Sequence, residues 1–134
     1  MAGYLLDTNH LNAALAPVSH VRDRIYQVHR TGIRLGTCVP ALCELEVGLQ
    51  LRKNSEPFRR ALQNLLKKVR VWPLNLDVVS YYAEIYLSLR RKGRALSQVD
   101  IMLAAIAERM KITVLTSDRD FEALSDIRTE NWIA

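Results

Sequence analysis

The chain has 134 residues, 49% of them hydrophobic and 25% charged, with a formal net charge of +5. These values are ordinary for one globular domain with a hydrophobic core, and they exclude a disordered, collagen-like or repeat protein. Its longest apolar run, residues 101–107, is far shorter than the ~20 residues that cross a bilayer. Since no signal-peptide pattern begins the chain, we expect a cytoplasmic protein with no membrane partner.

The first half of the sequence predicts two strands and three helices from apolar periodicity and capping residues. In chain order we expect a strand at 4–6, a turn at 7–9, a helix whose apolar spacing reaches Val18, a helix capped by Ser19 and closed at 31–32, a strand at 33–37, and a helix that begins at Pro40 and runs to about Lys53. Strands and helices therefore alternate from the start of the chain.

The second half continues the alternation and contains the clearest amphipathic helix of the sequence. In chain order we expect a helix capped by Ser55 with apolar residues from Phe58 to Val69, a very short strand at 70–72, a helix at 77–92 stopped by Gly93, a helix from Ser97 to about Lys111, a strand at 112–115, a brief helix around Phe121, and an edge strand within 127–132.

Alternating strands and helices indicate an α/β fold, in which a central, mostly parallel sheet carries helices on both faces. Residues 1–134 contain no linker or repeat, so we expect a single domain. In such folds ligands bind beyond the carboxyl ends of the strands. Candidate functional residues are therefore sought at those ends.

Four acidic residues fall where such a site is expected. Asp7 ends the first strand and Asp118 follows the strand at 112–115, so pairing of these strands puts both carboxylates on one rim. Glu44 flanks the apolar stripe of its helix beside small neighbours, whereas Glu46 falls on the side that we expect to be solvated. Asp100 lies in the first turn of its helix, above small alanine side chains.

Each acid alone also has a purely structural explanation. Asp7 or Asn9 suits a helix cap, the pairs Ser97/Asp100 and Ser117/Asp120 fit capping boxes, Asp118 suits a turn, and Glu44 suits a helix surface. Together, carboxylates on one rim repel each other unless a proton or a cation intervenes. Because hard oxygen ligands select Mg²⁺ or Mn²⁺, the set predicts a divalent metal site.

Other catalytic patterns are weak. The sequence contains no phosphate-binding glycine motif, and His10, His20 and His29 lack a matched nucleophile, so we expect structural or solvent-facing histidines. We expect both cysteines, Cys38 and Cys43, to be small buried hydrophobic residues rather than a zinc site or a disulfide. Hydroxyl and amide side chains near the acids are candidates to orient the carboxylates: Thr8, Asn9, Thr116 and Ser117.

The positive charge is concentrated in one part of the chain. Residues 22–94 hold 15 Lys and Arg against 6 Asp and Glu. This excess favours a polyanionic partner, because each cation that neutralises a phosphate releases counterions. The alternative is that these residues complement helix dipoles and keep the surface solvated.

The motifs resemble a PIN-domain protein of the VapC toxin type over essentially the whole chain. The matching segments are residues 4–9 (YLLDTN), Glu44-Leu45 followed by Gly48, residues 100–105 (DIMLAA), residues 115–118 (LTSD) with Phe121, and Asn131-Trp132. The resemblance implies a parallel sheet with flanking helices and a Mg²⁺- or Mn²⁺-dependent endoribonuclease whose acidic set falls on Asp7, Glu44, Asp100 and Asp118. It also implies a homodimer, neutralised by a cognate VapB-like antitoxin that lies along a hydrophobic groove and the active site.

Two positions depart from the usual pattern of that family. His10 stands where an aliphatic residue is common, and Ser117 stands where asparagine is frequent. Neither departure removes a carboxylate. Asp120, two residues after Asp118, is a second candidate for the fourth acid.

The leading hypothesis is a ribonuclease toxin in which a metal-activated water attacks a phosphodiester while basic residues of 22–94 position the RNA backbone. One competing hypothesis is a PIN-like module that binds RNA or an antitoxin without cutting. Another is a phosphatase or nuclease that acts on DNA or small phosphate esters with the same metal chemistry. The presence of all four acids favours an enzyme over a binding module.

Overall fold

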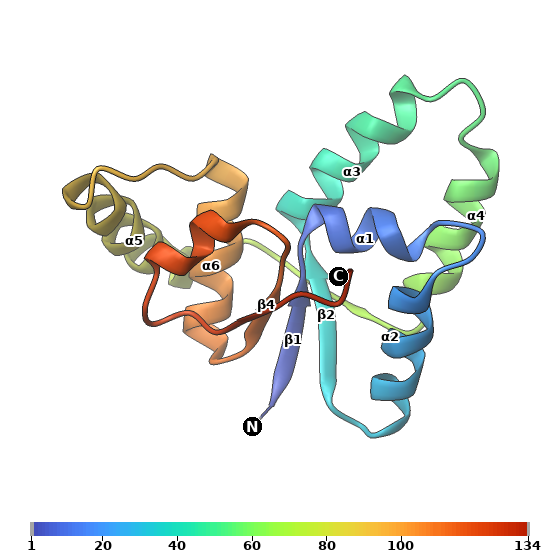
Figure 1. Ribbon diagram of the computed structural model, residues 1–134, viewed down its shortest axis with the longest axis horizontal. Coiled ribbons are helices and arrows are strands. Elements are labelled where there is room, and N and C mark those ends of the chain that lie inside the picture. The colour runs from blue at the N-terminus through green and yellow to red at the C-terminus, as the bar shows by residue number, and fades with distance from the viewer. Residues whose placement is uncertain (1, 134) are drawn as a thin grey trace.

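The computed structural model describes residues 2–133 and contains a five-stranded sheet of order β3-β2-β1-β4-β5 (Figure 1). Every neighbouring pair is parallel. The strands are β1 Gly3–Leu6, β2 Arg34–Cys38, β3 Arg70–Trp72, β4 Thr113–Leu115 and β5 Thr129–Glu130. The predicted parallel α/β sheet is confirmed.

Helices connect the strands and cover the sheet. They are α1 Thr8–Ala14, α2 His20–Arg30, α3 Val39–Leu51, α4 Glu56–Leu65, α5 Val79–Arg91 and α6 Gln98–Met110, with short 3₁₀ helices η1 Leu76–Val78 and η2 Arg119–Ala123. The chain moves outward from β1 to β3 and then returns past β1 to β4, so right-handed crossovers place the two groups of helices on opposite faces. Accordingly, α2 packs on β2 and α6 packs on β4 (Figure 1). Within residues 2–133, no helix is long and apolar enough to span a bilayer.

The register of β1 and β4 brings two strand ends together. Leu6 lies opposite Leu115, and the amide of Asp7 donates a hydrogen bond of 3.1 Å to the carbonyl oxygen of Leu115. The residues that follow these two strands therefore share one edge of the sheet. This is the edge at which ligands bind in open α/β folds.

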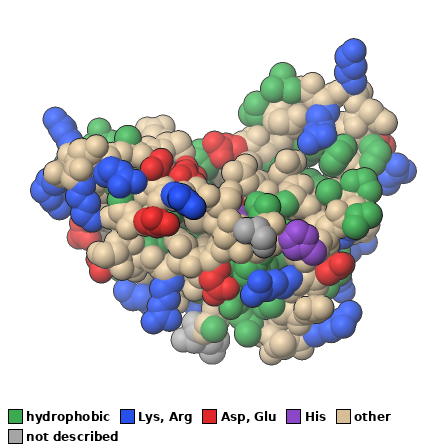
Figure 2. Space-filling model, viewed as in Figure 1, with side chains coloured by type: hydrophobic (Ala, Val, Ile, Leu, Met, Phe, Trp, Pro, Cys, Tyr) green, Lys and Arg blue, Asp and Glu red, His purple; other side chains and the backbone are tan. Residues whose placement is uncertain are grey.

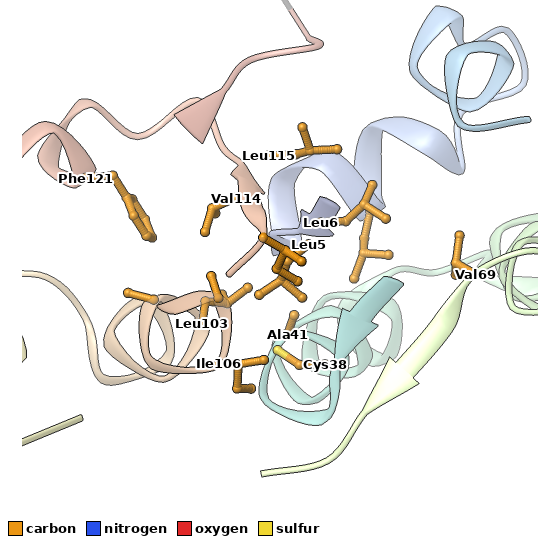
Figure 3. Close-up of a cluster of buried hydrophobic side chains, with 14 of the residues drawn as sticks. Leu5, Leu6, Cys38, Ala41, Val69, Leu103, Ile106, Val114, Leu115 and Phe121 are labelled. Atoms are coloured by element: carbon orange, nitrogen blue, oxygen red, sulfur yellow. The ribbon is translucent and has the colours of Figure 1, made fainter. Parts of the chain in front are cut away.

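The core lies between the centre of the sheet and its helices. Leu5 of β1 and Val114 of β4 point toward Leu103 and Ile106 of α6, whereas Leu6 points to the opposite face of the sheet (Figure 3). Full burial of such a side chain contributes about 1.5–3 kcal/mol. The central strands are thus held firmly at the edge where the acids lie.

Gly36 allows β2 and β3 to approach each other closely. A Cβ atom at this position would lie 2.7 Å from the carbonyl oxygen of Arg70 and 2.8 Å from the ring of Trp72. Since backbone cannot yield as a flexible side chain does, only glycine fits between these strands.

Several local predictions are wrong. The first helix ends at Ala14, and Val18 is 92% exposed, because Pro17 disfavours helical backbone at the residue before it. The Ser55 hydroxyl does not cap α4; it accepts a hydrogen bond of 3.3 Å from Nε of Arg59. Cys38 is buried, but Cys43 is exposed because it lies on the outer side of α3.

The cap of η2 also differs from the proposed capping box. Asp118, rather than Ser117, caps this short helix, and its carboxylate accepts from the amide of Asp120. Ser117 is exposed. Asp118 directly precedes the helix, so its short side chain reaches the free backbone amide of the first turn, whereas Ser117 lies one residue farther away.

Replacing Lys111 with glycine is expected to stabilise the protein. Lys111 ends α6 with left-handed backbone (φ 57°, ψ 48°), a conformation in which its Cβ is strained. Lys111→Gly should raise the free energy of unfolding by about 0.5–1 kcal/mol, measured by urea unfolding. Lys111→Ala, which removes the charge and keeps the Cβ, should give no gain. Equal gains in both variants would contradict this explanation.

Candidate functional site

Asp7 is the most buried of the four acids. It follows β1 as the N-cap of α1 and is only 4% exposed. Its Oδ1 accepts a hydrogen bond of 2.7 Å from the backbone amide of His10. The structural and functional explanations of Asp7 are therefore compatible, because one oxygen caps the helix while Oδ2 has no hydrogen-bond partner within residues 2–133.

His10 adds a second bond to the same oxygen. Its Nδ1 lies 2.9 Å from Oδ1 of Asp7, and its Nε2 accepts a 3.0 Å hydrogen bond from the backbone amide of Trp132. The ring has no exposed surface. The expected structural role of His10 is confirmed, but its link to Asp7 and Trp132 was not anticipated. Its spacing three residues after Asp7, at the start of a helix, was the available local signal.

Asp118 occupies the end of β4. Its backbone amide donates a hydrogen bond of 3.1 Å to Oγ1 of Thr116, and its Oδ1 accepts a hydrogen bond of 2.9 Å from the backbone amide of Asp120. Asp120 instead forms a 3.0 Å ion pair with Arg94. A cation of the chain itself thus already neutralises Asp120, whereas Asp118 has no ion pair within residues 2–133.

The pKa of Asp100 is raised by burial and by the neighbouring acids. Burial raises the pKa of this carboxyl from 3.8 to about 6, against the opposing effect of a hydrogen bond with Ser97. The negative charges of Asp118, Glu44 and Asp7 contribute smaller parts of the same rise. Asp7, Glu44 and Asp118 therefore each lie within electrostatic reach of Asp100.

Glu44 enters this group from α3. Its Oε1 accepts a hydrogen bond of 2.7 Å from Oγ1 of Thr8, which joins α3 to the first turn of α1. Glu46, by contrast, binds both terminal nitrogens of Arg59 at 2.8 and 2.9 Å, which lowers its pKa to about 2, with help from Gln50. The expectation that Glu46 faces solvent rather than the acidic group agrees with its 43% exposed side chain.

The surface beside Glu44 is hollowed. A hollow of about 220 Å³ lies between α1 and α3, lined by Thr8, Asn9, Asn12, Glu44, Gly48 and Arg52, among others. A larger hollow of about 830 Å³ opens at the amino ends of β1 and β4, away from the acids. Figure 2 shows acidic side chains at the notch between the α5–α6 half and the α3–α4 arm and on the adjoining part of the α5–α6 half, with Lys or Arg side chains among them and on the outer flanks.

The four acidic side chains offer the type of ligand atom that a hard divalent cation prefers. All four side chains offer carboxylate oxygens, and the hydrogen bonds within residues 2–133 use only one oxygen each of Asp7, Glu44 and Asp118. Among the same residues, no three His, Cys, Asp or Glu side chains already stand in an arrangement able to hold an ion. Asp7 is buried, whereas Glu44 is exposed and Asp100 is half-buried.

Comparison with known proteins places the chain in a family. A model of the PIN domain matches residues 4–127. The chain is 25% identical over 132 residues to a protein named ribonuclease VapC2 of Rickettsia felis, covering 96% of this chain and 97% of the relative. It is 24% identical to a tRNA(fMet)-specific endonuclease VapC of Salmonella typhimurium, over 98% of this chain and 99% of that protein.

Solved structures share the fold over nearly the whole chain. The VapBC2 complex of Rickettsia felis, bound to a promoter DNA fragment, contains a chain with a TM-score of 0.88 and 21% identity, covering 97% of this chain and 98% of that one. The DNA-bound VapBC complex of Salmonella typhimurium contains a chain with a TM-score of 0.84 and 25% identity, covering 98% and 99%.

Proposed function

Since the chain belongs to the PIN domain family, we propose that it is a divalent-metal-dependent endoribonuclease and the toxin of a VapBC-type toxin–antitoxin pair. The two relatives described above are named as RNA-cleaving VapC enzymes, and the chain aligns with nearly their full length. The observation that supports the proposal best is the pairing of β1 with β4, which brings Asp7 and Asp118 to one edge of the sheet, where the charges of Asp7, Glu44 and Asp118 also act on Asp100.

In this proposal Asp7, Glu44, Asp100 and Asp118 hold Mg²⁺ or Mn²⁺. When bound, such an ion lowers the pKa of water, which supplies a nucleophile, and neutralises charge developing on a phosphodiester. Asp7 provides a fixed ligand, because the amide and ring of His10 hold its Oδ1. Glu44 is aimed by the hydroxyl of Thr8, and the Ser97 hydrogen bond favours the charged form of Asp100.

The RNA backbone would contact cations around the acidic group. Arg52 lines the hollow beside Glu44, and Arg94 lies at Asp120, two residues from Asp118. Phosphate contacts position a nucleic acid without reading its sequence. Loss of either arginine is therefore expected to weaken binding evenly across RNA sequences and to reduce its salt dependence.

The proposed protein partners are a VapB-like antitoxin and a second copy of the chain. The similar solved structures described above are VapBC complexes. On α3, Val47 is 61% and Leu51 81% exposed, on the same helix as Glu44 and Gly48. An apolar antitoxin segment on this face would cover these side chains and reach the acidic group.

Chelation tests the metal dependence. Purified protein should cleave RNA with Mg²⁺ or Mn²⁺, lose cleavage with EDTA, and regain it when Mn²⁺ is added in excess, because phosphodiester attack needs the cation. Gel analysis of a labelled RNA, with a DNA of matched sequence as control, gives the readout. Cleavage that survives EDTA would contradict the proposal, and RNA binding without cleavage would favour the binding-module alternative.

A further inference from the structure

His10 lies between the Asp7 carboxylate and the C-terminal segment 129–133, and its side chain is fully buried. Two hydrogen bonds leave opposite edges of the ring, one from Nδ1 to Oδ1 of Asp7 and one between Nε2 and the amide of Trp132. An aliphatic side chain fills similar space but makes neither bond. The ring therefore joins residues that are 125 positions apart in the sequence.

The bond to Trp132 fixes the tautomer of the ring. A backbone amide only donates, so Nε2 must accept and carries no proton. The ring proton then sits on Nδ1, which donates to Oδ1 of Asp7. Without the Trp132 amide, the other tautomer would become available, and Nδ1 would face the carboxylate as a second acceptor.

The C-terminal segment is itself anchored at several points. The carbonyl oxygen of Trp132 lies 3.1 Å from Nε2 of His20. The indole ring of Trp132 packs on the ring of Tyr4 at a centroid distance of 5.0 Å. The guanidinium of Arg24 lies 4.3 Å from the centroid of the same ring. Trp132 is only 3% exposed. The amide that His10 accepts from is thus held by contacts to β1 and α2.

We propose that His10 is a positioning residue that transmits the anchorage of the C-terminal segment to Asp7. By holding Oδ1, it keeps Oδ2 turned toward the acidic group. The side chain of Asp7 is then already ordered before the cation binds, so that binding costs less conformational entropy. Groups that orient a ligating side chain commonly change metal affinity about 10–100-fold when removed. This inference rests on the metal site of the proposed function.

Two substitutions separate the bonds of the ring. In His10→Asn, the amide nitrogen takes the place of Nδ1 and keeps the bond to Asp7. In His10→Gln, the longer side chain places its oxygen near Nε2 and keeps the bond to Trp132 instead. Each variant loses one buried hydrogen bond, so both should unfold at lower temperature than the wild type. Only His10→Gln releases the side-chain bond to Asp7.

Titration with Mn²⁺ by calorimetry, on folded protein without RNA, tests the inference. His10→Asn should bind Mn²⁺ within about 3-fold of wild type, whereas His10→Gln should bind about 10–100-fold more weakly. Equal Mn²⁺ affinities in all three proteins, equal losses in both variants, or a larger loss in His10→Asn would overturn it. If the wild type takes up no Mn²⁺, or if Asp7→Asn binds as tightly as wild type, the proposed metal site itself fails.

Discussion

Asp7→Asn is expected to lose more than about 10²-fold in RNA cleavage while remaining folded. Removing a group that only orients a metal ligand costs up to about 100-fold, so removing a charge that contacts the ion should cost more. Asparagine is as good a helix cap as aspartate, and its oxygen still accepts from the amide of residue 10. Single-turnover cleavage and a thermal melt, on the same preparation, separate the two effects.

Asp23→Asn and Asp120→Asn are matched controls for this substitution. Asp23 is an exposed acid in the first turn of α2, so its charge should not affect cleavage. Asp120 neighbours the site but pairs with Arg94, so its amide variant should keep most activity. If Asp7→Asn cleaves RNA as fast as either control, Asp7 takes no part in the mechanism. If Asp120→Asn alone loses activity, Asp120 rather than Asp118 is the fourth acid of the site.

Asp100→Asn is expected to abolish cleavage and yet stabilise the metal-free protein at pH 7.5. Burial and the neighbouring carboxylates raise the pKa of Asp100 to about 6, so the charged form is disfavoured in the folded state. A neutral amide avoids that repulsion. Because the side chain is half-buried and solvent screens it, the gain is on the order of 1 kcal/mol, or about 3 °C in Tm.

The sign of the pH dependence follows from the same shift. The folded protein holds the Asp100 proton up to about pH 6, whereas the unfolded chain releases it near 3.8. The contribution of Asp100 to stability therefore falls as pH rises through this window and is constant above it. Thermal melts without metal should show the advantage of Asp100→Asn at pH 7.5 and none below pH 3.5.

Added Mn²⁺ should reverse this order at pH 7.5. The ion binds the folded wild type and raises its Tm, while the variant lacks one ligand and gains less. A variant that is less stable than wild type without metal, or that gains as much from Mn²⁺, would contradict the role of Asp100.

Much of the fold was predictable because its signals are local. Apolar runs bounded by Asp7 and by Pro73 mark strands, and the apolar spacing from Phe58 onward marks α4, although this helix ends at Leu65 and does not reach Val69 as the spacing predicts. Parallel order then follows from alternation and right-handed crossovers. The errors concern local details: helix ends, the exposure of Cys43, and caps such as Ser55, whose hydroxyl accepts a hydrogen bond from the Arg59 side chain instead of from a backbone amide.

The site was predictable in part, because carboxylates at strand ends carry a positional meaning. That argument places Asp7 and Asp118 on one edge, and the observed pairing of β1 with β4 agrees. The bond from Trp132 to His10 was not predictable, since it joins a backbone amide near the end of the chain to a ring near its start. A backbone donor is the same in every residue and leaves no trace in the sequence.

A crystal soaked in Mn²⁺ and measured near the manganese absorption edge would show whether the acids bind a cation. We expect an anomalous peak at the carboxyl edge of the sheet, within about 2.0–2.3 Å of oxygens from at least Asp7, Asp100 and Asp118. An anomalous peak elsewhere, or none at a Mn²⁺ concentration that supports RNA cleavage, would contradict the proposed metal site.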